Sequence, residues 1–354
     1  MYSGFLPKSF SVFFSDAGGI KQSAVSTAGN YSKRREKGDV RNSKDWENAL
    51  QGIEIIVHLA AETGTGQSMY EVHKYVDTNC GGTARMLDYL VNQSHRVQKV
   101  IVASSRAIYG EGKYFCDEHG VTYPGSRKDN HLSSGKFEPI CELCNKNLHV
   151  LPTDENSKIH PSSIYGITKL NQEQLVLNVC NSLNIPALAF RYQNVYGPGQ
   201  SLKNPYTGIL SIFSTQIRNG KGLNIFEDGM ETRDFVYIDD VVEATLLGIE
   251  SDTREQIALN VGSGVATTVI KVAQKLIVLY KSDTPINISG SYRLGDIRHN
   301  FAAIENAEKL LGFKPKHSFD AGITEFTKWV LDQEVYSDRY DESISEMKSR
   351  GLFK

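Results

Sequence analysis

Short apolar runs alternate along the chain with segments of helical spacing, and this alternation constrains the fold more than any other feature. The runs at residues 52–61, 97–104 and 185–192 are rich in β-branched residues and suit strands buried on both faces. Between them, residues 83–92 and 169–183 carry apolar positions at helical intervals. The pattern favours a doubly wound, mostly parallel α/β sheet, in which ligands bind beyond the carboxyl ends of the strands.

The length of 354 residues is enough for two lobes around one cleft. We assign residues 1–195 to the domain that holds the sheet, and residues 196–332 to a smaller substrate lobe from which some chain crosses back. Residues 113–160 are polar and far exceed an ordinary connection of about 2–6 residues, so they are expected to form an insertion. Residues 333–354 are charged and predict a peripheral helix or a partly disordered tail.

The charge balance excludes a partner recruited by a strong electrostatic field. The sequence has 39 Lys and Arg residues against 41 Asp and Glu residues, which gives a formal net charge of −2. We therefore expect no nucleic-acid partner. No apolar run approaches the ~18 residues of a membrane span, and residues 1–14 lack the apolar core of a secretory signal. These features predict a cytoplasmic protein that does not enter a membrane.

A Tyr-x-x-x-Lys motif joins Tyr165 to Lys169, and Pro161-Ser162-Ser163 precede it as a helix start. Residues four apart share a helix face. The lysine ammonium is expected to lower the pKa of the Tyr165 phenol by Coulomb attraction, which makes it a usable general base. On its own, such a pair is more often a solvated surface pair.

Two hydroxyls follow the apolar run at residues 97–104. Ser104 belongs to its end and Ser105 comes directly after it, at the strand terminus where this fold places its ligands. Ser105 there suits a hydrogen bond to a reacting hydroxyl group. A serine that closes a strand by turn chemistry is the competing interpretation.

Five motifs occur in order between residues 104 and 299, and the family resemblance that they carry runs from about residue 38 to about residue 315. They are S-S-R-A-I-Y-G at 104–110, Y-G-I-T-K at 165–169, R-Y-Q-N-V-Y-G-P-G at 191–199, R-D-F-V-Y-I-D-D at 233–240 and G-D-I-R-H at 295–299. Together they resemble the extended short-chain dehydrogenases, the NAD-dependent epimerase/dehydratase family. Within that family, A-A-E-T-G-T-G-Q-S-M-Y, Q-S-L-K-N-P-Y-T-G and the cysteine-bearing insertion are most similar to the 4-epimerases of dTDP-L-rhamnose.

The resemblance implies bound NAD and a catalytic trio. Tyr165 corresponds to the catalytic acid and base, Lys169 to its pKa partner and a ribose contact, and Ser105 to the group that binds the reacting hydroxyl. Asn79 would hold the cofactor strands together. The cofactor contacts that the resemblance implies are Asp39, Val40, Leu59, Ala60, Ala61, Asn79, Ser104, Tyr165, Lys169 and Tyr192.

The resemblance also implies a nucleotide-sugar substrate and a homodimer through the helices beside Tyr165. Asn194, Arg233 and Arg293 correspond to ligands of the sugar diphosphate. Arginine suits a diphosphate because its guanidinium group donates two hydrogen bonds to one anion. Phe226 would lie against the base and Asp296 near the nucleotide ribose, while Ser105 meets the sugar.

One departure from the sequences of the family's dehydratases narrows the set of reactions expected for this chain. The family's 4,6-dehydratases carry an acidic pair just after the catalytic hydroxyl residue, and here Arg106-Ala107 follow Ser105. Elimination of water is therefore disfavoured. The readings that stay open are 4-epimerisation through a transient 4-keto sugar and net reduction of a 4-keto sugar, on a dTDP-, UDP- or GDP-linked substrate.

The insertion carries two pairs of metal-ligand residues, with two residues between the members of each pair: Cys116 with His119, and Cys141 with Cys144. Gly120 and Asn145 follow the pairs, and these residue types adopt positive φ most readily, which turns backbone amides toward metal-bound sulfur. In a reduced compartment the pattern favours a closed, structural Cys3His zinc site. Two alternatives stay open: His149 replaces one ligand, or the cysteines bind no metal.

The start of the chain departs from the family. Members open with a strand, a glycine-rich turn of the form G-x-x-G-x-x-G and a helix whose N-terminus seats the cofactor pyrophosphate. Here residues 10–14 resemble a strand, Gly18-Gly19 a turn, and residues 22–37 lack an amphipathic stripe. The first β-α unit is expected to be lost or replaced, leaving apolar neighbours exposed. Two functions follow: a working epimerase with a divergent start, and a truncated, catalytically silent relative that binds a partner.

Overall fold

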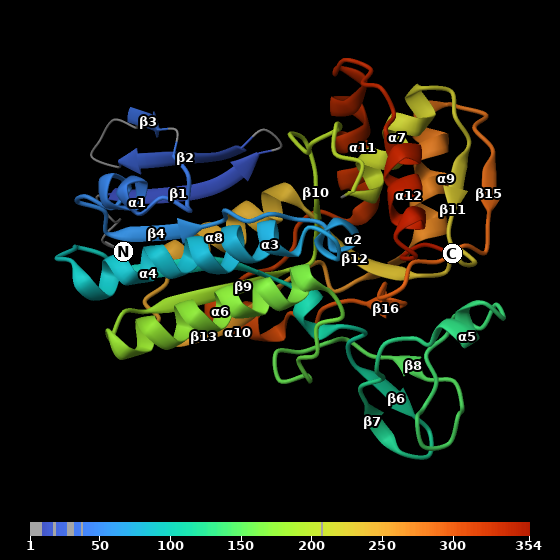
Figure 1. Ribbon diagram of the computed structural model, residues 1–354, viewed down its shortest axis with the longest axis horizontal. Helices are drawn as coiled ribbons and strands as arrows, with labels where there is room; N and C mark the ends of the chain where they lie inside the picture. Colours follow the sequence, from blue (N-terminus) through green and yellow to red (C-terminus); the bar gives the residue numbers. More distant parts are fainter. Residues whose placement is uncertain (1–8, 17–18, 27–31, 37, 207) are drawn as a thin grey trace.

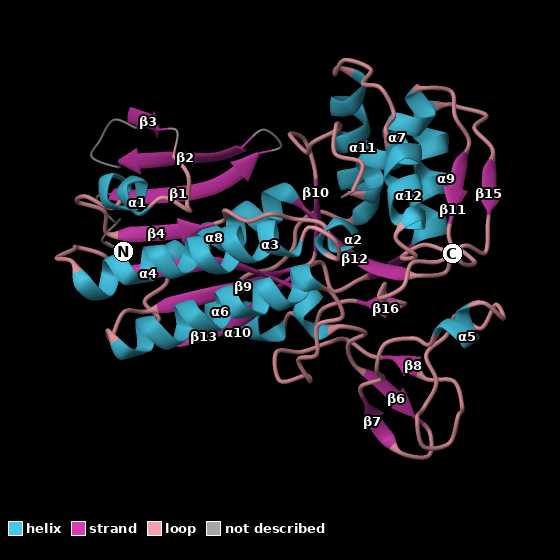
Figure 2. Cartoon of the chain, viewed as in Figure 1, coloured by secondary structure: helices cyan, strands magenta, loops and turns pink. Residues whose placement is uncertain are grey.

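The computed structural model describes residues 9–16, 19–26, 32–36, 38–206 and 208–354, and most of them surround one large sheet (Figures 1 and 2). In spatial order its strands are β13 (Gln256–Val261), β9 (Ala187–Tyr192), β5 (Lys99–Ser105), β4 (Ile55–His58), β1 (Ser9–Asp16), β2 (Gly19–Ser26) and β3 (Ser32–Glu36). The pairs from β13 to β1 are parallel, and β2 and β3 are antiparallel additions. The predicted doubly wound, mostly parallel α/β sheet is confirmed.

Helices cover both faces of this sheet because its central strands are apolar on both sides. One face packs against α1 (Ser43–Ala49), α4 (Gly82–Asn92) and α6 (Ile164–Ser182). The other packs against α8 (Ile238–Glu250) and α10 (Glu305–Leu311). Val100 and Val102 of β5 face the first group of helices, and Ile101 faces the second. Short helical segments complete this domain: α2 (Thr65–Ser68), α3 (Val72–Tyr75), a π-helix (Val76–Gly81) and a 3₁₀-helix (Arg106–Tyr109).

The N-terminal segment replaces the family's first β-α unit, as one of the two alternatives had it, and it does not leave β4 without a neighbour. The central strand is present, since β1 contains the predicted strand at residues 10–14 and pairs in parallel with β4, from Phe10 opposite Ile55 to Phe13 opposite His58. The chain then returns antiparallel as β2, where the family has a helix. Gly18 of the expected turn lies outside the described residues, and Gly19 begins β2. The first β-α unit is therefore replaced by strands, and β4 keeps a parallel neighbour.

A second lobe is built on another sheet, whose strands are β10 (Asn194–Tyr196), β12 (Thr232–Tyr237), β14 (Ala266–Thr268) and β16 (His299–Asn300). Beside it lie the pair β11 (Leu223–Ile225) and β15 (Ile286–Ile288) and the helices α7 (Ile209–Arg218), α9 (Val269–Tyr280) and α11 (Phe319–Leu331). Phe213, Phe235 and Phe326 belong to their common apolar core. This core fixes β12, whose side chains reach the pocket described below.

The insertion at residues 113–160 forms a small lobe of its own, seen in green at the lower right of Figure 1. Its elements are β6 (Tyr114–Cys116), β7 (Gly120–Thr122), α5 (Asp129–Leu132) and β8 (His149–Val150), with β6 between the two other strands. The apolar cluster at its centre consists of Tyr114, Cys116, Cys141 and Leu148. We call this segment the insertion lobe.

The C-terminal tail is helical, as one of the two expectations had it, but it is not peripheral. Tyr340 and Met347 of α12 (Tyr340–Ser349) are buried. The backbone N–H groups of Tyr292 and Lys354 each donate to the other residue's carbonyl, at 2.8 and 3.0 Å. The tail is thereby fixed to the second lobe.

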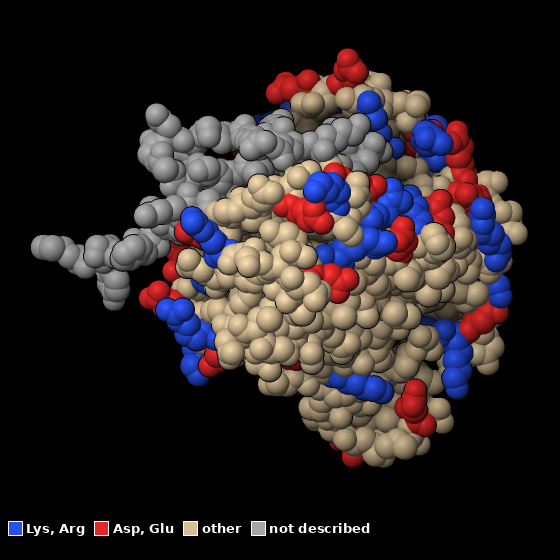
Figure 3. Space-filling view, turned by 60° about the vertical axis from the view of Figure 1, so that its left-hand side comes forward, with Lys and Arg blue, Asp and Glu red and all other residues tan. Residues whose placement is uncertain are grey.

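Charged side chains of both signs are interspersed on the face drawn in Figure 3, which agrees with the small net charge. Among the described residues no helix is long and apolar enough to cross a membrane.

Candidate active site

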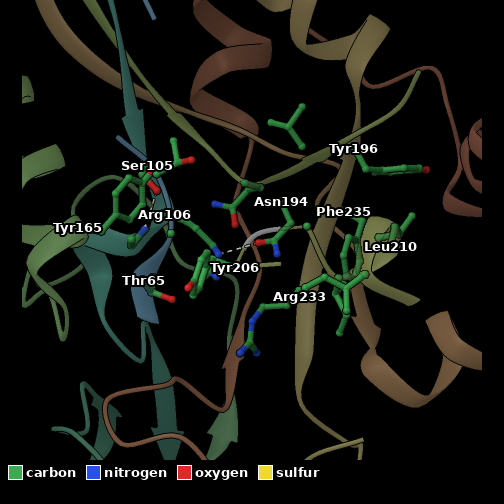
Figure 4. Close-up of a pocket in the computed structure, with 18 of the residues that line it drawn as sticks. Thr65, Ser105, Arg106, Tyr165, Asn194, Tyr196, Tyr206, Leu210, Arg233 and Phe235 are labelled. Atoms are coloured by element: carbon green, nitrogen blue, oxygen red, sulfur yellow. Dashed lines mark hydrogen bonds between the residues drawn. The ribbon is translucent and has the colours of Figure 1, made fainter. Parts of the chain in front are cut away.

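A pocket of about 580 Å³ opens at the carboxyl ends of β5 and β9, and both lobes contribute to its walls (Figure 4). Ala103 to Ala107 line it from β5 and the 3₁₀-helix beyond, and Tyr192 lines it from β9. The second lobe contributes side chains of β12, α7 and α12. This is the edge of a parallel sheet at which ligands bind.

The structure brings Ser105, Tyr165 and Lys169 to this pocket. Ser163 begins α6 by accepting a hydrogen bond from the Gly166 N–H at 3.1 Å. Gly166 has to be glycine, because a Cβ there would lie 2.6 Å from the carbonyl oxygen of Ala107. The close approach of α6 to the 3₁₀-helix after β5 places the Tyr165 side chain beside that of Ser105 (Figure 4), whose hydroxyl acts on the protonation of the phenol.

Burial controls the protonation of this trio. It raises the pKa of Tyr165, while the hydrogen bond with Ser105 and the charge of Arg106 oppose the rise. Burial also lowers the pKa of Lys169 to about 7, and its Nζ donates to Gln172 Oε1 at 2.8 Å. The pKa of Tyr165 thus shifts in the direction opposite to the expected lowering by Lys169, because desolvation of the phenol outweighs the effects of the Ser105 hydroxyl and the Arg106 charge.

The residues expected around the cofactor fall into two groups. Leu59, Ala61, Ser104 and Tyr192 line the pocket. Asn79 lies behind it and joins two elements, because its amide bonds both backbone polar groups of Glu62 and donates to Thr168 Oγ1 of α6 at 2.9 Å.

The remaining expected cofactor residues do not line the pocket. Ala60 is buried beneath it. Val40 packs beside Gly82, and the carboxylate of Asp39 pairs with Arg41 at 2.6 Å. The resemblance assigns Asp39 and Val40 to the adenine of the cofactor, and this contact stays a prediction.

NAD fits one end of this site better than the other. The hydroxyls and apolar side chains at the ends of β4, β5 and β9 suit a nicotinamide riboside. In the family the pyrophosphate rests on a helix N-terminus after the first strand. Among the described residues from 19 to 36 no helix follows β1, and β2 occupies that part of the chain.

All five residues expected to hold the sugar nucleotide line the pocket: Asn194, Phe226, Arg233, Arg293 and Asp296. Arg233 pairs with the Asp296 carboxylate at 3.3 Å, and the Arg293 guanidinium lies 4.9 Å from the centre of the Phe226 ring. Asn194 Oδ1 accepts from Arg106 Nε at 2.7 Å (Figure 4). The set therefore offers an aromatic face and cationic groups, as a nucleoside diphosphate requires.

Several lining residues were not predicted from the sequence: Arg106, Gln193, Tyr206, Glu231 and Tyr340. Glu231 has a buried Oε2 without a hydrogen-bond partner. Burial, with a further contribution from Glu227, raises its pKa to about 7. Side chains alternate along an extended segment, so Glu231 shares a face with Arg233 and Phe235 of β12, and this signal was available in the sequence.

The predicted metal ligands Cys116, His119, Cys141 and Cys144 come together in the insertion lobe, and their ligand atoms lie within 4.8 Å of one another. Cys116 Sγ is 3.5 Å from His119 Nδ1 and 3.6 Å from Cys144 Sγ. Gly120 and Asn145 have φ of +74° and +57°, the positive values expected for them. His149 is exposed and pairs with Asp117 instead. Three sulfurs and one imidazole are the donor set of a structural zinc site.

Residues 19–262 match the NAD dependent epimerase/dehydratase family. The chain belongs to this family. The epimerase/dehydratase resemblance stated from the motifs is thereby confirmed.

Relatives within the family support the same placement. A dTDP-L-rhamnose 4-epimerase of Burkholderia thailandensis is 37% identical over 300 residues, which cover 83% of this chain and 80% of that protein. The UDP-glucose 4-epimerase of Thermotoga maritima, solved with UDP-glucose, has a TM-score of 0.67 at 28% identity and covers 83% of either chain. MoeE5, solved with UDP-glucuronic acid and NAD, has a TM-score of 0.68 at 26% identity over 84% of this chain and 85% of that one.

Proposed function

We propose that the protein is an NAD-dependent nucleotide-sugar 4-epimerase that interconverts dTDP-L-rhamnose and dTDP-6-deoxy-L-talose. The observation that carries the proposal is the convergence of Ser105, Tyr165 and Lys169, the last two one helical turn apart, on one pocket that also holds Arg233 and Arg293. The named Burkholderia thailandensis relative supports the choice of sugar and nucleotide.

The chemistry follows from these side chains. Ser105 holds the C4 hydroxyl of the sugar by a hydrogen bond, and Tyr165 removes its proton and later returns it. Leu59, Ala61, Lys169 and Tyr192 would hold NAD, whose chemistry when bound is the reversible acceptance of a hydride from C4. The 4-keto sugar turns over within the pocket before the hydride returns to the opposite face, so no cofactor is consumed.

The pocket disfavours elimination of water. Among the described residues that line it, the carboxyl groups are those of Glu231 and Asp296, and Asp296 is paired with Arg233. Arg106, which follows Ser105, is engaged with Asn194. A second candidate function is the epimerisation or 4-keto reduction of a UDP- or GDP-linked sugar. The catalytic trio would act at C4 of the sugar in the same way, whichever nucleotide the sugar carries.

Incubation of the purified protein with each candidate nucleotide sugar tests the proposal. We expect proton NMR to show a mixture of the two C4 epimers from dTDP-L-rhamnose without added reductant. Epimers formed faster from a UDP- or GDP-sugar would establish the second reading. Stoichiometric oxidation of NADH with a 4-keto nucleotide sugar, and no C4 epimer from dTDP-L-rhamnose, would show a reductase.

The strand that replaces the family's first helix favours a competing function, a catalytically silent relative that binds a partner. The two are separated by the NAD retained on the purified protein after gel filtration. An epimerase that recycles its cofactor is expected to retain about one NAD per chain. A protein that retains none, and binds none on titration, is the silent relative.

We also propose a structural Zn2+ in the insertion lobe and a homodimer through the exposed face that carries Val72, Val76 and Ile167. The donor set supports the first, and the apolar side chains on α3, the π-helix and α6 support the second. Elemental analysis should give one zinc per chain. Light scattering should give twice the mass of the chain, and Ile167→Glu should shift it to the monomer value.

A further inference from the structure

The insertion lobe reaches the nucleotide end of the pocket through buried charges that the catalytic proposal does not use. Arg127, between β7 and α5, pairs with Glu111 at 3.2 Å and with Glu227 at 2.7 Å, and all three side chains are at most 5% exposed. Its NH2 group also donates to the backbone carbonyl of Asp296 at 3.0 Å. One guanidinium therefore ties the lobe to two separate segments.

A second contact from the lobe repeats this arrangement. Glu138 pairs with Arg298 at 2.6 Å and with His299 at 3.0 Å. Arg298 pairs in turn with Glu227 at 2.9 Å, and its backbone N–H donates to Glu111 Oε2 at 2.8 Å. The charges form one connected network, and buried members of such networks have few alternative arrangements.

The far ends of the network are walls of the pocket. Asp296 lines it and pairs with Arg233. Glu227 follows Phe226, which lines the pocket beneath Arg293, and it holds the left-handed backbone with φ of +49°. A non-glycine residue in that region is kept there by its surroundings, and the ion pairs of Glu227 supply them.

The insertion lobe has only a small apolar core with which to hold Arg127 and Glu138 in these positions. Two of the four residues in its apolar cluster, Cys116 and Cys141, are also members of the metal-ligand set. A segment of this size with so small a core depends on metal ligation to keep its fold. Loss of the metal would free Arg127 and Glu138 to move.

We infer that metal binding in the insertion lobe sets the affinity of the pocket for its nucleotide sugar, with Arg127 and Glu138 as the positioning residues that transmit it. The inference rests on the proposed function for the identity of the ligand. Because linkage between two binding sites is reciprocal, dTDP also tightens binding of the metal by the same factor. The catalytic trio lies outside the network, so the rate at saturating substrate is unaffected.

The first experiment compares the zinc-loaded wild-type protein with the same protein after zinc removal by a chelator. Calorimetry with dTDP is expected to give a Kd about 10-fold weaker for the zinc-free protein. KM should rise by a similar factor, while kcat and retained NAD stay the same. An equal Kd for dTDP in the two forms, or a purified protein without metal, would overturn the inference.

Variants separate the metal from the charges. Cys144→Ser should lose both zinc and dTDP affinity, whereas Arg127→Met should keep zinc and lose affinity. Glu138→Gln serves the same purpose if Arg127→Met does not fold. Leu143→Ala, at a side chain 75% exposed between the two cysteines, and His149→Ala are matched controls that keep both properties.

Binding of dTDP needs no turnover, so the two proposals fail separately. A protein with zinc-dependent dTDP binding and no C4 exchange contradicts the epimerase proposal and leaves the coupling in place. An active epimerase with the same dTDP affinity in the presence and absence of zinc contradicts only the coupling between metal binding and nucleotide affinity.

Discussion

At the scale of single residues, the Tyr165 phenol is the group on which the proposed reaction depends. Replacement by phenylalanine removes the proton acceptor and keeps the ring. We expect Tyr165→Phe to lower kcat by about 10²- to 10⁴-fold. KM, retained NAD and the melting temperature should change little. A variant with wild-type kcat would assign the base to another residue.

Glu231 gives a prediction about pH. Its folded-state pKa of about 7 lies above the ordinary value of 4.5, so the folded protein binds this proton more tightly and its stability falls as the pH rises from 4.5 to 7. Glu231→Gln removes that loss. The variant should gain about 1–3 kcal/mol in the free energy of unfolding at pH 8 and nothing at pH 4.5. Urea titrations at both pH values, with the exposed Glu250→Gln as control, check this.

Sequence patterns identified pocket residues well where a motif carries them. Ser105, Tyr165 and Lys169 converge as expected. The direction of the Tyr165 pKa was wrong, because spacing places a charge near a phenol but does not report how deeply both are buried. Tyr206 and Tyr340 were missed, since segments distant in the sequence bring them to the pocket.

At the scale of elements, α6 determines the geometry of the proposed catalysis because it carries both Tyr165 and Lys169. Ser163→Ala removes its N-terminal cap and should cost about 1 kcal/mol of stability. It should also lower kcat, by about 10-fold, through displacement of the phenol.

The matched control is Ser318→Ala, which removes the equivalent cap of α11. It should show a similar or smaller loss of stability with unchanged kcat. Equal kcat in the two variants would show that the start of α6 does not position Tyr165.

The central strands and their helices were predictable because local apolar patterns encode burial on two faces. Residues 97–104 and 185–192 became β5 and β9 almost unchanged. The N-terminal strands could not be predicted from the sequence, apart from the strand at residues 10–14. The segment that became β2 and β3 has no strong periodicity, and its strands are defined by pairing with β1 and with each other.

At the scale of the whole molecule, the C-terminal tail closes the end of the pocket that Phe226 and Arg293 line. Tyr340 lines it, and the Phe353 ring lies 4.8 Å from that of Phe226. Removal of residues 340–354 should raise KM by about 10-fold with a smaller change in kcat, because both rings leave Phe226. Steady-state kinetics check this, with Arg339→Ala, at an exposed ion pair, as the control. An unchanged KM would leave the tail without a role in binding.

The tail also shows a feature that its amino-acid composition did not predict, namely its burial against the second lobe. Its charged composition suggested a peripheral segment, whereas Tyr340, Met347 and Phe353 are buried. Composition averages over a segment, and a docking helix needs one apolar stripe only.

The central claim is that C4 of a nucleotide sugar is oxidised and reduced again within one pocket. A substrate carrying deuterium at C4, dTDP-[4-²H]-L-rhamnose, tests it in a single incubation followed by mass spectrometry and NMR. We predict the C4 epimer with the deuterium retained at C4, since the same hydride leaves and returns. No epimer, or an epimer that has exchanged the label with water, would contradict the account.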